Sequence, residues 1–123
     1  RAFVVHGESG WDEPTPVGPY HLFEVTQYTV THRVEDPADF GVPRCKPADL
    51  AGGDPAYNAA ELLKVLGGQT GPHRDALTLG ASLALRVTGK ADDPVDGLTQ
   101  ATAAIDSGRA LALVNRLDET VHV

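Results

Sequence analysis

Two adjacent carboxylates, Asp12 and Glu13, are the residues of this sequence best suited to chemistry. They suit a hard divalent cation, because Mg²⁺ binds one or two carboxylates and completes its octahedron with water and phosphate oxygens. In an extended backbone the two side chains would point to opposite faces, so both can serve one ion only where the chain bends. Gly10 before the pair and Pro14 after it favour such a bend. On residue types alone, an acidic pair beside a proline is more often a solvated turn.

A short apolar run, Phe3-Val4-Val5, precedes the acidic pair and has the composition of a β-strand that ends at His6-Gly7. A strand that leads into a glycine-containing loop with paired acids commonly delivers ligands to the edge of an α/β sheet. His6 and Gly7 belong to the same loop and are therefore candidates for contact with a substrate. The alternative for His6 is a structural role at the strand end.

The other nucleophilic and metal-ligating residues show no comparable pattern. Cys45 has no neighbouring histidine, and Ser9 lies outside a Gly-x-Ser-x-Gly motif, so we expect neither to act as a nucleophile. Arg74 and Asp75, at the start of a helix, are expected to form structural ion pairs or caps. The remaining histidines have no metal-ligand spacing and are expected to be exposed or structural: His21, His32, His73 and His122.

The composition limits the classes of function. The 123 residues carry a formal net charge of −7 with scattered Lys and Arg, which argues against a nucleic acid as partner. No apolar run reaches membrane-spanning length, and a single cysteine fits a reducing compartment, so we expect a cytoplasmic protein without membrane contact. Because the sequence opens on a core-like strand without a methionine, we also expect a piece of a longer protein.

The hydrophobic pattern predicts an α/β fold with about three strands followed by four helices. We expect the strands within about residues 2–34, a connecting loop over 35–53 and the helices over 54–117. The segment Ala76–Leu85 carries no charge, so we expect its helix to be buried on most sides. Helix starts are signalled by prolines that follow a capping residue or a glycine: Asp54-Pro55, Gly71-Pro72 and Asp93-Pro94.

Several short motifs, in order along residues 1–117, resemble the C-terminal part of the anthranilate phosphoribosyltransferase family, which is itself similar to pyrimidine nucleoside phosphorylases. The motifs that carry the resemblance are Val4-Val5-His6-Gly7 with Asp12-Glu13, Asp36-Pro37 with Asp39-Phe40-Gly41, Gly52-Gly53-Asp54 with Asn58-Ala59-Ala60, Gly71-Pro72 with Arg74-Asp75-Ala76, and Ala104-Ile105-Asp106-Ser107-Gly108. The sequence departs from the family at Trp11, Pro14 and Gly80, where relatives usually carry other residues.

The resemblance implies the C-terminal segment of a catalytic domain that transfers phosphoribosyl from phosphoribosyl pyrophosphate (PRPP) to anthranilate in tryptophan biosynthesis. It implies Mg²⁺ as cofactor, held by Asp12 and Glu13 beside the departing pyrophosphate, and a homodimer for the complete enzyme. The family's phosphate loop, its Lys-His-Gly-Asn-Arg motif and its anthranilate-binding arginine are not found in these residues, so this segment alone is expected to be inactive.

Two other interpretations remain open at this stage. The chain could belong to a non-catalytic relative that binds a ligand or partner without turnover, which an altered phosphate loop upstream would indicate. It could also be a free-standing structural module, which a sharp cooperative thermal transition of the isolated residues would support.

Overall fold

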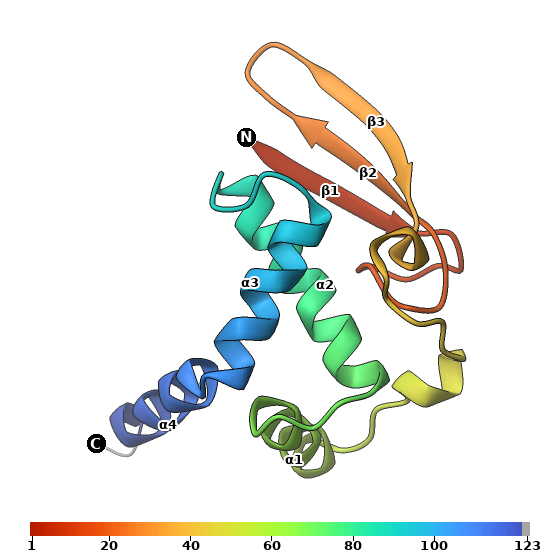
Figure 1. The fold of residues 1–123 in the computed structure, drawn as a ribbon. Coiled ribbons are helices and arrows are strands. Elements are labelled where there is room, and N and C mark those ends of the chain that lie inside the picture. Colours follow the sequence, from red (N-terminus) through yellow and green to blue (C-terminus); the bar gives the residue numbers. More distant parts are fainter. Residues whose placement is uncertain (122–123) are drawn as a thin grey trace.

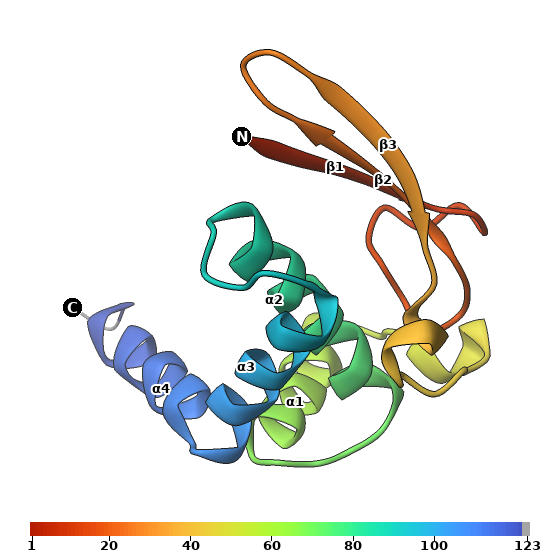
Figure 2. The same ribbon diagram turned by 45° about the horizontal axis from the view of Figure 1, so that its top comes forward.

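The computed structural model describes residues 1–121, which form a small antiparallel sheet and a separate group of four helices (Figures 1 and 2). The strands are β1 (Ala2–Gly7), β2 (Tyr20–Val25) and β3 (Val30–Glu35). The helices are α1 (Pro55–Leu66), α2 (Pro72–Val87), α3 (Pro94–Asp106) and α4 (Arg109–Val121). The predicted order of three strands and four helices is confirmed, while His122 lies outside the described residues.

The sheet is a three-stranded meander in the order β1-β2-β3. Alternation along each strand directs Phe3 and Val5 of β1 and Tyr20 and Leu22 of β2 toward the helices. Tyr20 and Leu22 are almost fully buried, at 2% and 0% exposure. The β2–β3 hairpin closes through the Thr26 N–H, which donates to the Thr29 carbonyl at 2.8 Å.

The segment predicted as a loop over 35–53 contains more regular structure than expected. Glu35 is the last residue of β3, and two short 3-10 helices follow, η1 (Pro37–Phe40) and η2 (Pro47–Leu50). The Asp36 side chain caps η1 by accepting a hydrogen bond from the Ala38 N–H at 2.9 Å. These short helices connect the sheet to α1.

The helices begin where their capping residues predicted. Asp54 accepts a hydrogen bond from the Tyr57 N–H, and Asp93 accepts one from the Asp96 N–H, each at 2.8 Å. A small core forms where α1, α3 and α4 meet, with Val65, Leu66 and Ile105 buried. Among the described residues, none of the helices combines the length and the hydropathy needed to cross a bilayer.

Helix α2 has an unusual distribution of polarity. Its buried positions include Arg74, Thr78, Ser82 and Arg86, whereas the apolar Leu77 is 38% exposed. Within Ala76–Leu85, the segment predicted to be buried on most sides, only Leu77 and Ala84 are exposed, so one side of the helix is open and the others are covered. The prediction for Arg74 is confirmed: it forms a structural ion pair with Asp106 of α3, at 2.6 Å.

Candidate metal-binding site

The site is built on a tight turn at the end of β1. The Gly10 N–H donates to the Gly7 carbonyl at 2.9 Å, and the Gly7 N–H donates to the Trp11 carbonyl at 2.8 Å. Gly10 has a φ of +88°, a conformation that glycine adopts without strain. A Cβ atom at Gly7 would lie 2.9 Å from the Cβ of Trp11, so the turn can close only around a glycine.

The turn delivers Asp12 and Glu13 to the surface. Both carboxylates are exposed, the chain bends at both residues, and Pro14 immediately after them is fully buried. Within the described part of the chain, neither carboxylate makes an ion pair or a hydrogen bond, so their oxygens are free to bind a cation. No three His, Cys, Asp or Glu side chains among the described residues could together hold a metal ion. Asp12 and Glu13 therefore offer two oxygen ligands, which fits Mg²⁺ with water and phosphate in its other positions.

Glu13 lines a groove of about 590 Å³ between the loop that joins β1 to β2, helix α1 and helix α2. Most of the groove wall is apolar, with the small residues Gly80, Ala81 and Ala84 of α2 along it. A second apolar groove, of about 720 Å³, runs between α2, α3 and α4. Leu77, Ala81 and Ala84 border both grooves, so the open face of α2 is one continuous apolar ridge with a carboxylate at one border.

Of the four predicted site residues, Glu13 lines this groove, and Asp12 directly precedes it in the same exposed bend without lining the groove. His6 is exposed on the outer face of β1, where it lies opposite His21 of β2, and it does not line the groove with Glu13. Gly7 is buried at the base of the turn, where it allows the close approach of Trp11. Substrate contact by His6 and Gly7 remains a prediction.

Two further sequence predictions concern residues outside the groove. Cys45 is a free cysteine, and burial together with Asp49 and Asp75 raises the pKa of its thiol, which disfavours the nucleophilic thiolate. His21 and His32 lie together on the outer face of the sheet, with 2.9 Å between their Nδ1 and Nε2 atoms.

The sequence profile of the "Glycosyl transferase family, a/b domain" matches residues 1–111. The chain therefore belongs to this glycosyl transferase family. Among curated family members, anthranilate phosphoribosyltransferase 2 of Streptomyces coelicolor is 48% identical over 117 residues, covering 94% of this chain and 35% of the relative. The corresponding enzyme of Geotalea uraniireducens is 45% identical, covering 95% of this chain and 33% of the relative. The chain thus spans about a third of the length of these relatives.

Solved structures agree with this family assignment. Anthranilate phosphoribosyltransferase from Thermus thermophilus superimposes with a TM-score of 0.84 at 33% identity, covering 94% of this chain and 34% of that one. The Saccharomyces cerevisiae enzyme, solved in complex with PRPP and Mg, gives a TM-score of 0.80 at 24% identity, covering 89% and 32%. The α/β fold predicted for the C-terminal part of such a domain is therefore confirmed.

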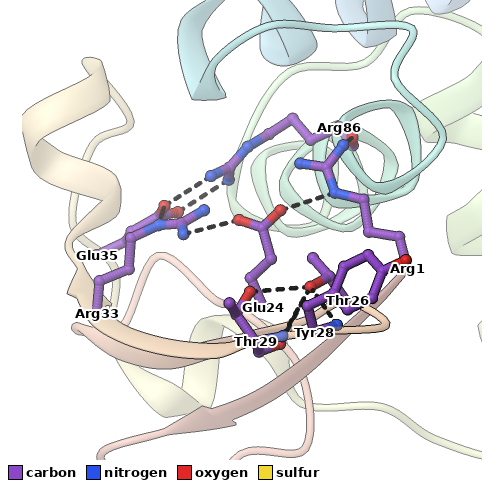
Figure 3. A network of polar contacts seen from close by, with 8 residues as sticks. All are labelled: Arg1, Glu24, Thr26, Tyr28, Thr29, Arg33, Glu35 and Arg86. Atoms are coloured by element: carbon purple, nitrogen blue, oxygen red, sulfur yellow. Dashed lines mark hydrogen bonds and ion pairs between the residues drawn. The ribbon is translucent and has the colours of Figure 1, made fainter.

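A buried polar cluster in this glycosyl transferase family member was missed by sequence reasoning. Glu35 of β3 accepts hydrogen bonds from Arg86 of α2, at 2.6 and 2.9 Å, and from the Tyr20 hydroxyl at 2.5 Å (Arg86 and Glu35 in Figure 3). Burial opposes ionisation of Glu35, but the hydrogen bonds from Arg86, Tyr20 and Arg33 outweigh it and lower the pKa to about 2. Burial and the bond to Glu35 raise the pKa of Tyr20.

The polar cluster extends along the sheet through Arg33, which donates to both Glu35 and Glu24, and through Arg1, which donates to Glu24 at 2.7 Å (Figure 3). Three guanidinium groups, of Arg1, Arg33 and Arg86, lie between 5.2 and 5.9 Å from the centre of the Phe3 ring. The sequence signals for this cluster were an acidic residue at the end of a strand and an arginine directly after the uncharged run Ala76–Leu85.

Proposed function

We propose that residues 1–123 are the C-terminal segment of the α/β domain of an Mg²⁺-dependent anthranilate phosphoribosyltransferase. The observation that carries the proposal is the pair of exposed, unpaired carboxylates, Asp12 and Glu13, of which Glu13 lines a groove, in a chain 48% identical to such an enzyme. The yeast enzyme that shares this fold was solved with PRPP and Mg, which supports the same substrate and cation. The reaction would transfer phosphoribosyl from PRPP to anthranilate, in tryptophan biosynthesis.

Asp12 and Glu13 would hold Mg²⁺ through their carboxylate oxygens. A bound divalent cation stabilises the negative charge that a pyrophosphate leaving group develops. In this role the two side chains fix where the positive charge lies and transfer no proton. The tight turn from Gly7 to Gly10 and the buried Pro14 restrict the backbone on both sides of the pair.

The open apolar ridge of α2 supports a second part of the proposal. We propose that the remainder of the same polypeptide covers the groove and supplies the contacts to phosphate and anthranilate. An apolar surface bordering an unpaired carboxylate is what a domain presents where another segment packs beside a metal site. The resemblance extends the proposal to a cytoplasmic homodimer, with the dimer contact in the family's N-terminal helical region.

The complete protein with Asp12→Asn plus Glu13→Gln tests the metal assignment. We expect the rate at saturating PRPP and anthranilate to fall by about 100-fold or more, because an ion that stabilises the transition state by several kcal/mol is lost. The same double change at the other Asp-Glu dipeptide, Asp118→Asn plus Glu119→Gln, is the matched control and should leave the rate unchanged. A first double variant with normal rate and normal Mg²⁺ requirement would remove Asp12 and Glu13 from the mechanism.

A further inference from the structure

Gly7, Tyr20 and Glu35 are neighbours across the three strands at one end of the sheet, and we call them the terminal row. The loop that carries the acidic pair begins directly after Gly7 and ends directly before Tyr20. Both ends of the loop therefore start from one row of residues, and all three members of this row are buried. Any shift of the row would move the loop.

This terminal row is fixed to α2 by charged hydrogen bonds. Both Glu35 oxygens accept from Arg86, and one of them also accepts from the Tyr20 hydroxyl. Glu35 and Arg86 are 8% and 5% exposed, so these bonds lie in a region of low effective dielectric where charged hydrogen bonds are strong. In the described residues, no buried side-chain nitrogen or oxygen lacks a hydrogen-bond partner, so the arrangement is fully satisfied.

Backbone hydrogen bonds connect the terminal row to the segments on either side of the acidic pair. Gly7 donates to the carbonyl of Trp11, the residue immediately before Asp12. Glu8 donates to the carbonyl of Pro19, the residue immediately before Tyr20, at 3.1 Å. Pro14, directly after Glu13, is fully buried. Asp12 and Glu13 thus lie between Trp11, which is bonded to Gly7 of the terminal row, and the buried Pro14.

Arg86 also belongs to the helix whose Gly80 and Ala84 line the groove beside Glu13. We infer that Tyr20, Glu35 and Arg86 are positioning residues, which hold the acidic loop at a fixed place against the α2 wall of the groove. This inference rests on the proposed function, because it assigns the three residues to the geometry of the Mg²⁺ site. None of the three would itself touch the cation.

Tyr20→Phe in the complete protein tests the inference, because it removes one hydroxyl and keeps both the ring and the Glu35–Arg86 bonds. The probe is Mn²⁺ in the presence of pyrophosphate, with protein-bound Mn²⁺ measured from its enhancement of water-proton relaxation. We expect the Mn²⁺ dissociation constant to rise about 3- to 10-fold, below the 10- to 100-fold typical of groups that contact a ligand residue directly. Glu35→Gln should raise it further. Tyr28→Phe, at an 86% exposed tyrosine on the β2–β3 hairpin, is the matched control and should change nothing.

A purely structural role would lower the unfolding temperature without changing Mn²⁺ affinity, so the titrations are made well below the melting midpoint of each variant. Unchanged affinity in Tyr20→Phe, together with its loss in Asp12→Asn plus Glu13→Gln, would overturn the positioning role and leave the metal assignment intact. Unchanged affinity in the Asp12 and Glu13 double variant would overturn both. A weaker Mn²⁺ complex in Tyr20→Phe with normal affinity in Tyr28→Phe supports the inference.

Discussion

Helix α2 has two contrasting faces. Toward the sheet and α3 it buries Arg74, Ser82 and Arg86, each of which makes a hydrogen bond or ion pair. On the opposite side Leu77 and Ala84 are exposed, and the half-buried Gly80 and Ala81 border the grooves beside them. Four of the five buried residues of this helix are therefore polar or charged, and Leu79 is the apolar exception.

The contrast shows that burial on α2 does not follow hydropathy alone, because its buried polar side chains have specific partners. On the inner face every buried charge is matched, above all in the Glu35–Arg86 pair, so removing one partner would leave the other charge buried alone. The outer face has the composition of a protein interior, which is the reason for proposing that another part of the polypeptide covers it. Three experiments test how far the two faces differ: substitution of Arg86, acidification, and alanine substitution of two helical glycines.

Arg86→Met is expected to have the largest effect on stability. It leaves the Glu35 carboxylate buried without its main partner, and breaking a buried pair from one side typically costs about 3–5 kcal/mol. Urea unfolding followed by circular dichroism measures the loss. Glu35→Leu combined with Arg86→Met should recover a large part of it, because no unpaired charge then remains buried. A single variant as stable as the wild type would show that the inner face does not depend on this pair.

Acid should weaken the inner face next. The pKa of Glu35 falls from its ordinary value of 4.5 to about 2 in the folded chain. A depressed carboxyl pKa contributes stability that is fully present above pH 4.5 and is lost as the pH falls toward 2. The difference corresponds to about 3 kcal/mol in the free energy of unfolding. Urea midpoints between pH 5 and 2 should fall more steeply in the wild type than in Glu35→Gln; parallel curves would contradict the assignment to Glu35.

Two helical glycines compare the closed and open faces directly, with the smallest expected effect. A Cβ at Gly97 of α3 would lie 2.9 Å from the Cβ and 2.2 Å from the Oγ of Ser82, so Gly97→Ala should cost about 1–3 kcal/mol. A Cβ at Gly80 meets nothing within 4 Å, so Gly80→Ala should stabilise the isolated chain by up to about 1 kcal/mol. Thermal unfolding measures both. If Gly80→Ala instead destabilises the complete protein, a further segment fills the groove there.

Local signals in the sequence were sufficient to predict the order of the elements. The helix starts at Pro55 and Pro94 follow from Asp54 and Asp93, whose caps depend only on residues three positions away. The bend at Asp12 and Glu13 could be predicted in the same way from Gly10 and Pro14. The bend that carries the candidate site could therefore be predicted, because the residues that determine it lie close together in the sequence.

The buried cluster could not be predicted because its members are far apart in the sequence and of ordinary type. Tyr20, Glu35 and Arg86 lie on three different elements, and only the register of the sheet and the docking of α2 bring them together. The open face of α2, at Leu77 and Ala84, could not be predicted for a related reason. A run without charge predicts burial in the finished protein, but it does not identify the segment that supplies the cover.

The separation of 51 residues between Glu35 and Arg86 has a consequence for folding kinetics. The β2–β3 hairpin and the α2–α3 pair can each form from contacts between neighbours in the chain. Joining them requires closure of a long loop, and the entropy of that closure is lost before the Glu35–Arg86 hydrogen bonds can stabilise the junction. We expect the junction to form after the folding barrier. Loss of the Arg86 guanidinium should then mainly accelerate unfolding and leave the refolding rate almost unchanged in stopped-flow measurements.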